Sequence, residues 1–389
     1  MSNIVRLVSA SDVTTRKKQQ GTTNRYNAMQ QQDILPIGGI PFADLYDIAH
    51  TSALYTDQTT ACIPCEGNAN FVLRQYKPIP LPCVFGWSQR ETLREWTALA
   101  SSADGSILYA VDGEVAQGYI YISIDSGVSW SQLQNSPVEY WISIATSTDG
   151  VNVVALVDGV GVQDGKIYTS GSSGDTWSQI IVPDQHWTSV ASSSDGVKLV
   201  ACCVAIVGGT APYGCIYTSG DSGGTWSLTS APNPYNWLCV ASSSDGVNLV
   251  ACVQGAPASI YTSGDSGVSW SPLSPVGLFM SVASSSSGAI LYAGDDTGVW
   301  KSTDFGSSWT QTPLVSGSVL SIATSTDGVK VIAVVTDGSV YRSTDTGSTW
   351  DLQVLSSPTT HLNATASSAD GEKLVVAGTN TLIYTFACT

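Results

Sequence analysis

One repeated phrase constrains the fold of this chain more than any other feature. It reads W-x-S-V-A-S-S-x-D-G, followed by an apolar run and then by I-Y-T-S-x-D-S-G-x-x-W-S. The Asp-Gly turn within it recurs every 40 to 50 residues, which is the length of one four-stranded propeller blade. The copies of this turn are Asp104-Gly105, Asp149-Gly150, Asp195-Gly196, Asp245-Gly246, Asp327-Gly328 and Asp370-Gly371, with Ser287-Gly288 as an altered copy.

Each repeat has the pattern of four short strands. In the third repeat these are predicted over Ser189–Ser193, Lys198–Val204, Cys215–Ser219 and Thr225–Thr229. The first strand is rich in small residues, as expected where blades converge at a hub, and the next two carry larger apolar residues that pack blade on blade. The sequence therefore predicts an all-β fold, a seven-bladed β-propeller of four-stranded blades over residues 84–389.

The seventh repeat ends before its fourth strand. A segment upstream of the first repeat, Gly86-Trp87-Ser88-Gln89, matches the fourth-strand segment Ser129-Trp130-Ser131-Gln132. We expect this N-terminal strand to pair with the strand around Ile383–Thr385 and to complete blade seven. Such closure removes an exposed sheet edge.

A second motif, S-x-D-x-G-x-x-W, occupies the turn between the third and fourth strands. In this motif the carboxylate accepts hydrogen bonds from turn amides, the glycine adopts a positive φ, and the Trp packs over the hairpin. We therefore expect a structural role for its aspartates, which are Asp125, Asp221, Asp265, Asp304 and Asp345; the second blade has Ser172 instead.

This motif resembles the Asp box, or BNR repeat, of the sialidase-like propellers, and the resemblance covers residues 84–389. It implies the fold and says little about activity. The sialidase arginine triad is not matched, because the propeller holds only Arg90, Arg94 and Arg342. Xyloglucan-cleaving relatives pair two propellers around a cleft where this chain has one. Photosystem-assembly relatives carry a basic patch that is missing here.

Charge and cysteine content exclude several classes of function. From Val84 onward eight Lys and Arg residues stand against 25 Asp and Glu residues, so a nucleic-acid partner is not expected. The nine cysteines are odd in number and are read as free thiols. Cys62-Ile-Pro-Cys65 lacks a second ligand pair, so neither a metal site nor another cofactor is expected.

Nothing in the sequence predicts membrane insertion or export. No apolar run reaches the length of a membrane span. The residues after Met1 do not form a signal peptide, so we expect synthesis in the cytosol and leave the final location open.

Residues 1–83, called the arm below, lack the repeat. Thr14–Gln32 is polar and includes Arg16-Lys17-Lys18, and two later stretches are set by proline. We expect an extended, mostly irregular arm, with one short helix over Phe42–Tyr55 and apolar anchors between Ile34 and Ile48. The arm would dock on its own propeller or on a neighbouring subunit, and the sequence favours neither.

Candidate ligand-binding residues come from aligning the repeats at the start of the first strand. One position is large and apolar and includes Trp96, Trp141, Trp187 and Trp237; the position before it includes Glu95, Tyr140, His186, Asn236 and His361. The large apolar position is explained by packing between blades, and the polar position before it by a hydrated rim around the channel mouth. The functional alternative is a site at the channel mouth that stacks a ligand on aromatic rings.

Two functions remain open from the sequence. The first is a non-catalytic structural or binding module of a larger assembly, such as a virion or another surface structure, with protein subunits bound through the arm. The second is a glycan-acting hydrolase with carboxylates at the mouth, for which Glu95 and Glu139 are the adjacent Glu residues.

Overall fold

The computed structural model describes Ile4–Ser9, Tyr55–Ile63, Phe71–Pro78 and most of residues 85–388. Within this last range it omits 114–115, 160–164, 183–184, 205–213, 234, 255–259, 274–276, 314–316 and 356–360. The chain separates into two compact units, Met1–Val84 and Phe85–Thr389. Among the described residues there is no helix that would reach across a membrane.

The first unit contains a three-stranded antiparallel sheet in the order β1-β3-β2. Its strands are β1 (Ile4–Ser9), β2 (Tyr55–Ile63) and β3 (Phe71–Pro78). The sequence analysis did not predict these strands, although β2 and β3 are rich in the β-branched and aromatic residues typical of strands. The helix predicted over Phe42–Tyr55 and the apolar anchors lie outside the described residues, except that Tyr55 begins β2.

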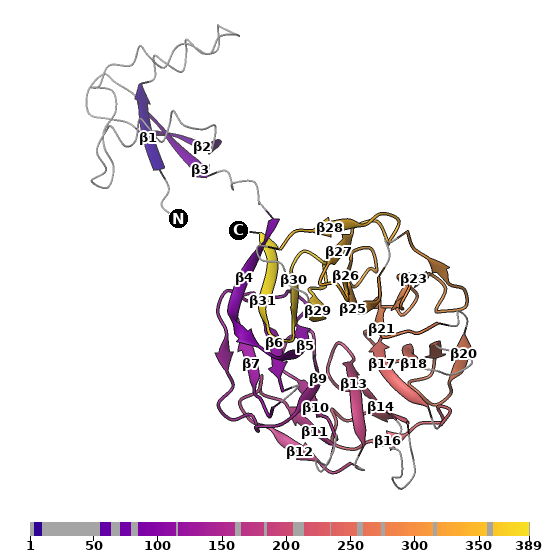
Figure 1. Cartoon of the computed structure of the whole chain (residues 1–389). Coiled ribbons are helices and arrows are strands. Elements are labelled where there is room, and N and C mark those ends of the chain that lie inside the picture. Colours follow the sequence, from indigo (N-terminus) through magenta and orange to yellow (C-terminus); the bar gives the residue numbers. More distant parts are fainter. Residues whose placement is uncertain are drawn as a thin grey trace. The chain divides into compact units, whose positions relative to one another are not determined.

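The second unit is a ring of seven blades, each of four antiparallel strands, which confirms the predicted fold (Figure 1). We name the strands of each blade A to D. Blade 1 contains β5 (Trp96–Ser101), β6 (Leu108–Asp112), β7 (Ile120–Ser123) and β8 (Ser131–Gln132). Blade 2 contains β9 (Trp141–Thr146), β10 (Val153–Val157), β11 (Lys166–Ser170) and β12 (Ser178–Ile180). Blade 3 contains β13 (His186–Ser192), β14 (Leu199–Val204), β15 (Ile216–Ser219) and β16 (Ser227–Leu228). Blade 4 contains β17 (Asn236–Ser242), β18 (Leu249–Gln254), β19 (Ile260–Ser263) and β20 (Ser271–Leu273).

The remaining blades follow the same plan. Blade 5 contains β21 (Ser281–Ser284), β22 (Leu291–Gly294), β23 (Val299–Ser302) and β24 (Thr310–Gln311). Blade 6 contains β25 (Val319–Thr324), β26 (Val331–Val335), β27 (Val340–Ser343) and β28 (Asp351–Gln353). Blade 7 contains β29 (Leu362–Ser367), β30 (Leu374–Gly378), β31 (Thr381–Cys388) and, from before the first repeat, β4 (Phe85–Arg94).

The predicted closure of blade 7 is confirmed. β4 pairs antiparallel with β31, with Trp87 opposite Phe386 and Ser88 opposite Thr385. The Trp87 and Phe386 rings lie 5.4 Å apart, and Trp87 Nε1 donates to Gln353 Oε1 at 3.3 Å in blade 6. Trp87 thus packs at the junction of blades 6 and 7. The Trp residues of the S-x-D-x-G-x-x-W motif take the same place at the other junctions.

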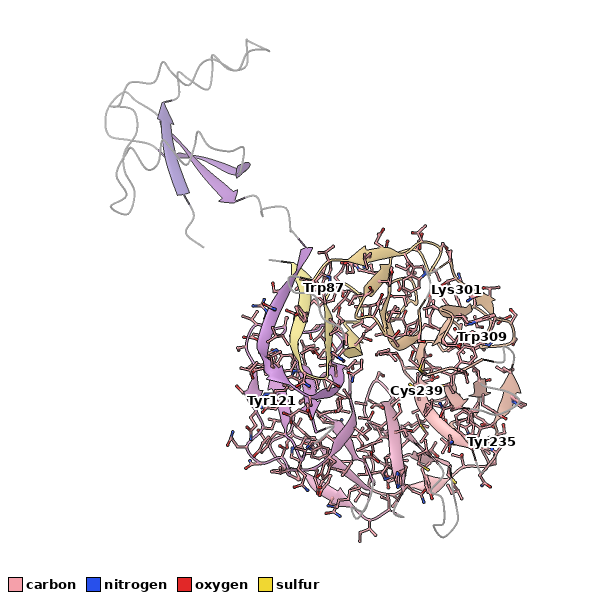
Figure 2. All side chains as sticks on the ribbon, viewed as in Figure 1. Trp87, Tyr121, Tyr235, Cys239, Lys301 and Trp309 are labelled. Carbon is pink, nitrogen blue, oxygen red and sulfur yellow. The ribbon has the colours of Figure 1, made fainter. Side chains whose placement is uncertain are left out.

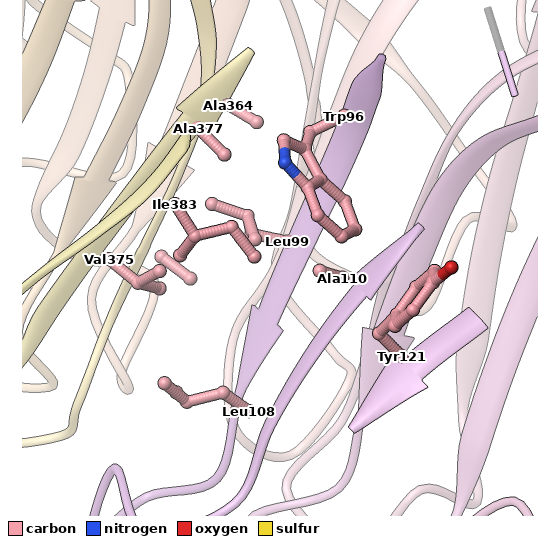
Figure 3. Close-up of a cluster of buried hydrophobic side chains, with 10 residues drawn as sticks. Trp96, Leu99, Leu108, Ala110, Tyr121, Ala364, Val375, Ala377 and Ile383 are labelled. Carbon is pink, nitrogen blue, oxygen red and sulfur yellow. The ribbon is translucent and has the colours of Figure 1, made fainter. Parts of the chain in front are cut away.

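Hydrophobic clusters fill the junctions between neighbouring blades. Figure 3 shows the junction of blades 7 and 1, where Trp96 and Leu99 meet Ala364, Val375 and Ile383. Burial of such apolar side chains is the dominant favourable term in folding. Because each cluster draws residues from two blades, no blade has a complete core of its own.

A continuous belt of backbone hydrogen bonds joins the A–B turns around the hub. Each turn donates one N–H to a carbonyl in the turn of the next blade, and the last bond, from Ala369 N to Ala103 O at 2.7 Å, returns to the first blade. The belt residues, in order, are Ala103, Thr148, Ser194, Ser244, Ser286, Thr326 and Ala369. The hub is therefore closed by backbone as well as by side-chain packing.

Candidate functional site

The A–B and C–D turns lie at one end of the blades, which we call the lower end. The D–A and B–C connections lie at the other, upper end. Strand direction in an antiparallel blade requires this separation. The two ends therefore hold different candidate residues.

At the lower end, the aspartates of the C–D turns serve their own hairpins. Asp221 is typical: Oδ1 accepts from Thr225 N at 2.8 Å and from Ser219 Oγ at 2.8 Å, and Oδ2 accepts from Thr225 Oγ1 at 2.7 Å. These bonds hold the pKa of Asp221 below its ordinary value, with the backbone N–H of Thr225 as the largest cause. Asp125, Asp265, Asp304 and Asp345 make the same contacts.

Blade 2 makes this turn without a carboxylate. Ser172 Oγ accepts from Thr176 N at 3.1 Å and lies 2.9 Å from Thr176 Oγ1. A neutral acceptor is therefore enough to form the hairpin, which is further evidence that the charge of the other five aspartates is not essential to the fold.

At the upper end, the four aromatic candidates are core residues. Trp96, Trp141, Trp187 and Trp237 are at most 1% exposed. Each ring packs at a steep angle on a Tyr of strand C in the same blade, as Trp96 does on Tyr121 with the centroids 5.2 Å apart. These rings present no face to a ligand.

The residue at the polar position, one before the Trp or its equivalent, accepts a backbone hydrogen bond from the residue that follows strand B of the same blade. The carbonyl of Tyr140 accepts from Asp158 N at 2.9 Å, and the carbonyl of His361 accepts from Thr379 N at 3.0 Å. Glu95 O does the same with Gly113 N at 3.3 Å. These bonds lie beside the β-bulges that interrupt strand A in most blades.

The side chains at this position differ from blade to blade. Asn236 and His361 are exposed, Glu95 is half-buried, and Tyr140 packs partly against the junction of blades 1 and 2. His186 Nδ1 lies 3.8 Å from Asp158 Oδ1. The sequence analysis placed these five residues together at the mouth. The partner of His186 in this pair, Asp158, is not one of the predicted residues.

The upper end of blade 1 carries an Arg–Asp pair. Arg94 Nη1 lies 3.6 Å from Asp112 Oδ2, and its guanidinium stacks over the Tyr121 ring at 4.6 Å. Burial raises the pKa of Asp112, while the N–H of Tyr119 and the charge of Arg94 oppose the rise. Within the described residues, Arg94 Nε and the Tyr121 hydroxyl are buried without a hydrogen-bond partner.

Blade 2 carries the strongest pair. The buried carboxylate of Glu139 accepts from Lys166 Nζ at 2.6 Å and from the Tyr168 hydroxyl at 3.0 Å. Burial, then the negative charge of Glu139, raises the pKa of Tyr168. A carboxylate held in this way is poorly placed to donate a proton to a leaving group or to attack a substrate.

Between blades 2 and 3, Asp158 faces His186. Burial raises the pKa of Asp158, and the charge of His186 lowers it in part. Together with the pairs of blades 1 and 2, this makes three acid–base pairs on neighbouring blades, a group we call the upper charged patch: Arg94–Asp112, Lys166–Glu139 and His186–Asp158.

Sequence reasoning missed Arg94, Asp112, Asp158 and Lys166 as members of this patch. A signal was present, because Val111-Asp112-Gly113 and Val157-Asp158-Gly159 repeat at the ends of two B strands. The sequence analysis assigned these two aspartates no role. Much of the B–C connections of blades 2 and 3, residues 160–164 and 205–213, lies outside the described residues. Across the part of the chain that is described, no group of three His, Cys, Asp or Glu side chains is arranged to hold a metal.

Comparison with known proteins identifies the architecture. The chain matches no protein-family model and no curated protein sequence. Among solved structures, the GH74 xyloglucanase from Xanthomonas campestris matches 77% of this chain and 53% of its own length, with a TM-score of 0.61 and 15% identity. This chain thus spans about half of that enzyme. YCF48 from Cyanidioschyzon merolae matches 78% of this chain and 98% of its own length, with a TM-score of 0.58 and 16% identity. A structure of YCF48 bound to D1 peptide matches with a TM-score of 0.56. At such identities the likeness shows the fold alone: the chain is a seven-bladed β-propeller.

Proposed function

We propose that this chain is a non-catalytic binding module that joins a larger assembly, and that the arm supplies contacts between subunits. The observation that carries the proposal is the pairing of the upper charged patch. Its three acids each lie beside a basic side chain of this chain, and the turn aspartates of the lower end are bonded to their own hairpins. Such groups suit recognition better than acid–base chemistry.

Charge supports an arm that docks on a propeller. The propeller sequence is strongly acidic, whereas the arm has seven basic and six acidic residues, with Arg16, Lys17, Lys18 and Arg25 close together. Opposite charges steer association and favour one docking orientation over others. If the arm docks on a neighbour, repetition builds a ring or a filament, as in assemblies of repeated subunits such as a virion surface.

The upper charged patch is the proposed surface for a further protein partner. The Arg94 side chain is 34% exposed there, and its guanidinium suits a peptide carbonyl or carboxylate. YCF48, which shares the fold, has been solved with a bound peptide. From this comparison we take only that a propeller of this fold binds a protein segment, and we propose the same kind of binding for this chain.

The proposal is tested by native mass spectrometry of the full chain beside a chain that lacks residues 1–80. The deletion retains all of β4 and therefore the closing strand of blade 7. We expect the full chain to form an assembly that weakens with salt and the shortened chain to stay a folded monomer. The substitutions Arg16→Ser, Lys17→Ser and Lys18→Ser, made together, should weaken assembly without changing the melting temperature. A monomeric full chain, or a shortened chain that assembles equally well, would contradict the proposal.

A glycan-acting hydrolase is the second candidate. It is favoured by the fold shared with the GH74 xyloglucanase and by the carboxyls of Asp112, which is buried, and Asp158, which is half-buried; both have a raised pKa and they lie on neighbouring blades. The test is whether the purified chain releases reducing ends from xyloglucan. If it does, and if both Asp112→Asn and Asp158→Asn abolish the release, the hydrolase proposal is supported and the non-catalytic proposal is wrong.

A further inference from the structure

Five free cysteines lie in two neighbouring blades of the propeller. The residues of the repeated motifs recur around the ring, but these thiols are concentrated in blades 3 and 4. They are Cys202, Cys203, Cys215, Cys239 and Cys252. This concentration is a departure from the repeat and calls for an explanation of its own.

Four of the five cysteines form two cross-strand pairs. Cys239 of β17 is directly opposite Cys252 of β18. Cys203 of β14 lies opposite Cys215, whose carbonyl accepts from Cys203 N at 3.0 Å. Directly opposed residues of antiparallel strands have Cα atoms about 4.5–5.5 Å apart, which a disulfide can span. The pairing therefore brings both pairs within the range of backbone separations that a disulfide requires.

The two pairs differ in access. Cys203 and Cys215 are at most 1% exposed, and Cys203 Sγ also lies 3.3 Å from Gln185 Oε1. Cys239 is only half-buried, on the A strand of blade 4, and Figure 2 shows it on the inner side of the ring. A small reagent therefore reaches Cys239 far more readily than it reaches the pair in blade 3.

The surroundings of Cys239 also favour its thiolate. Ser189 Oγ donates to its sulfur at 3.7 Å, and Cys252 lies directly opposite on β18. These two neighbours, Cys252 first, lower the pKa of Cys239 against the effect of burial. The contact with Cys239, followed by burial, raises the pKa of Cys252. The two pKa shifts run in opposite directions, which favours Cys239 as the attacking sulfur.

We propose that Cys239 and Cys252 form a thiol–disulfide exchange site that a low-molecular-weight disulfide oxidises to a cross-strand disulfide. In the first step the Cys239 thiolate attacks one sulfur of the reagent, its S–S bond breaks, and one thiolate leaves. In the second step Cys252 loses its proton and attacks the Cys239 sulfur of the mixed disulfide, which expels the second thiolate. The two protein thiols are oxidised, the reagent is reduced to two thiols, and those thiols take up the two protons.

The test uses the full-length chain and bis(2-hydroxyethyl) disulfide as the reagent. After reaction under native conditions, the remaining thiols are capped in denaturant and the chain is cut on the N-terminal side of aspartate. Cleavage before Asp221, Asp245 and Asp265 places Cys239 and Cys252 on separate peptides, 221–244 and 245–264. We expect a non-reduced mass spectrum to contain these two peptides joined, with Cys203 and Cys215 on peptide 195–220 still capped.

Variants separate the two steps. Cys252→Ser should stop at a mixed disulfide on Cys239, and Cys239→Ser should leave Cys252 on peptide 245–264 unreacted in the native chain. Cys215→Ser is the matched control from the buried pair and should leave the joined peptides unchanged. The proposal is overturned if the joined peptides form only in denaturant, if a bridge within peptide 195–220 forms first, or if Cys252 on peptide 245–264 reacts as fast in the Cys239→Ser chain as in the parent.

Discussion

At the scale of single residues, the C–D turns at the lower end of the blades share one contact. In each turn a side-chain oxygen accepts a hydrogen bond from the backbone N–H of the residue four positions later. Asp221 and Ser172 occupy equivalent positions and accept equivalent bonds from Thr225 and Thr176. An unsatisfied turn amide costs free energy, whichever acceptor is removed. The role of the aspartates was predictable from the motif because all of their partners are local in sequence.

We predict that Asp221→Ala lowers the melting temperature of the chain and that Asp221→Ser lowers it much less. Alanine leaves Thr225 N without an acceptor, whereas serine reproduces the turn of blade 2. Thermal unfolding followed by circular dichroism measures both. Equal effects of the two substitutions would mean that the charge of Asp221, and not its hydrogen bonds, stabilises the hairpin.

The effect of pH has a defined sign. The hydrogen bonds of the folded chain lower the pKa of Asp221. In the A–B turn of blade 1, the pKa of Asp104 is lowered to about 2, and the backbone N–H of Ser106 is the largest cause. A depressed pKa contributes stability above the ordinary value of 3.8, and that contribution is lost as the pH falls through the folded value. The difference in melting temperature between the parent and Asp221→Ala should therefore narrow as the pH falls below about 4.

At the scale of elements, the A–B turns are units of contact between blades. Asn152, just before β10 of blade 2, donates from Nδ2 to Asp195 O at 3.0 Å in the turn of blade 3. The glycine of that turn, Gly196, has a φ of +74°, and a Cβ there would lie 2.5 Å from Asn152 Cβ. The sequence predicted the turn and its glycine. It did not predict the contact with the next blade, because pattern within one repeat carries no information on the packing between repeats.

We predict that Gly196→Ala destabilises the chain by about 1–3 kcal/mol, from the strained φ together with the clash against Asn152. Gly220 of the same blade is the control: a Cβ there meets nothing within 4 Å, and Gly220→Ala should change stability by less than about 0.5 kcal/mol. Urea unfolding of both variants measures the difference. A Gly196→Ala chain as stable as the parent would show that blades 2 and 3 separate at this turn without cost.

At the scale of the whole molecule, the repeat period and the missing fourth strand of the last repeat were enough to predict seven blades and their closure. The candidate site was harder to predict. The aromatic ring at Trp96 and its equivalents belongs to the core. The upper charged patch joins residues from four blades, because Arg94 comes from β4 of blade 7 and the others from blades 1 to 3, at positions in the repeat that differ. Lys166 and Glu139, for example, are 27 residues apart and meet only because strand B returns the chain to the upper end, where strand C begins at Lys166.

The central claim is that residues 85–388 form one ring whose closure depends on β4. The direct measurement is thermal unfolding of two shortened chains, one without residues 1–80 and one without residues 1–94. We predict that the first keeps a single cooperative transition. The second should melt at a much lower temperature, because it exposes the edge of β31 and removes Trp87 from the junction of blades 6 and 7. Equal melting of the two chains would contradict closure by β4.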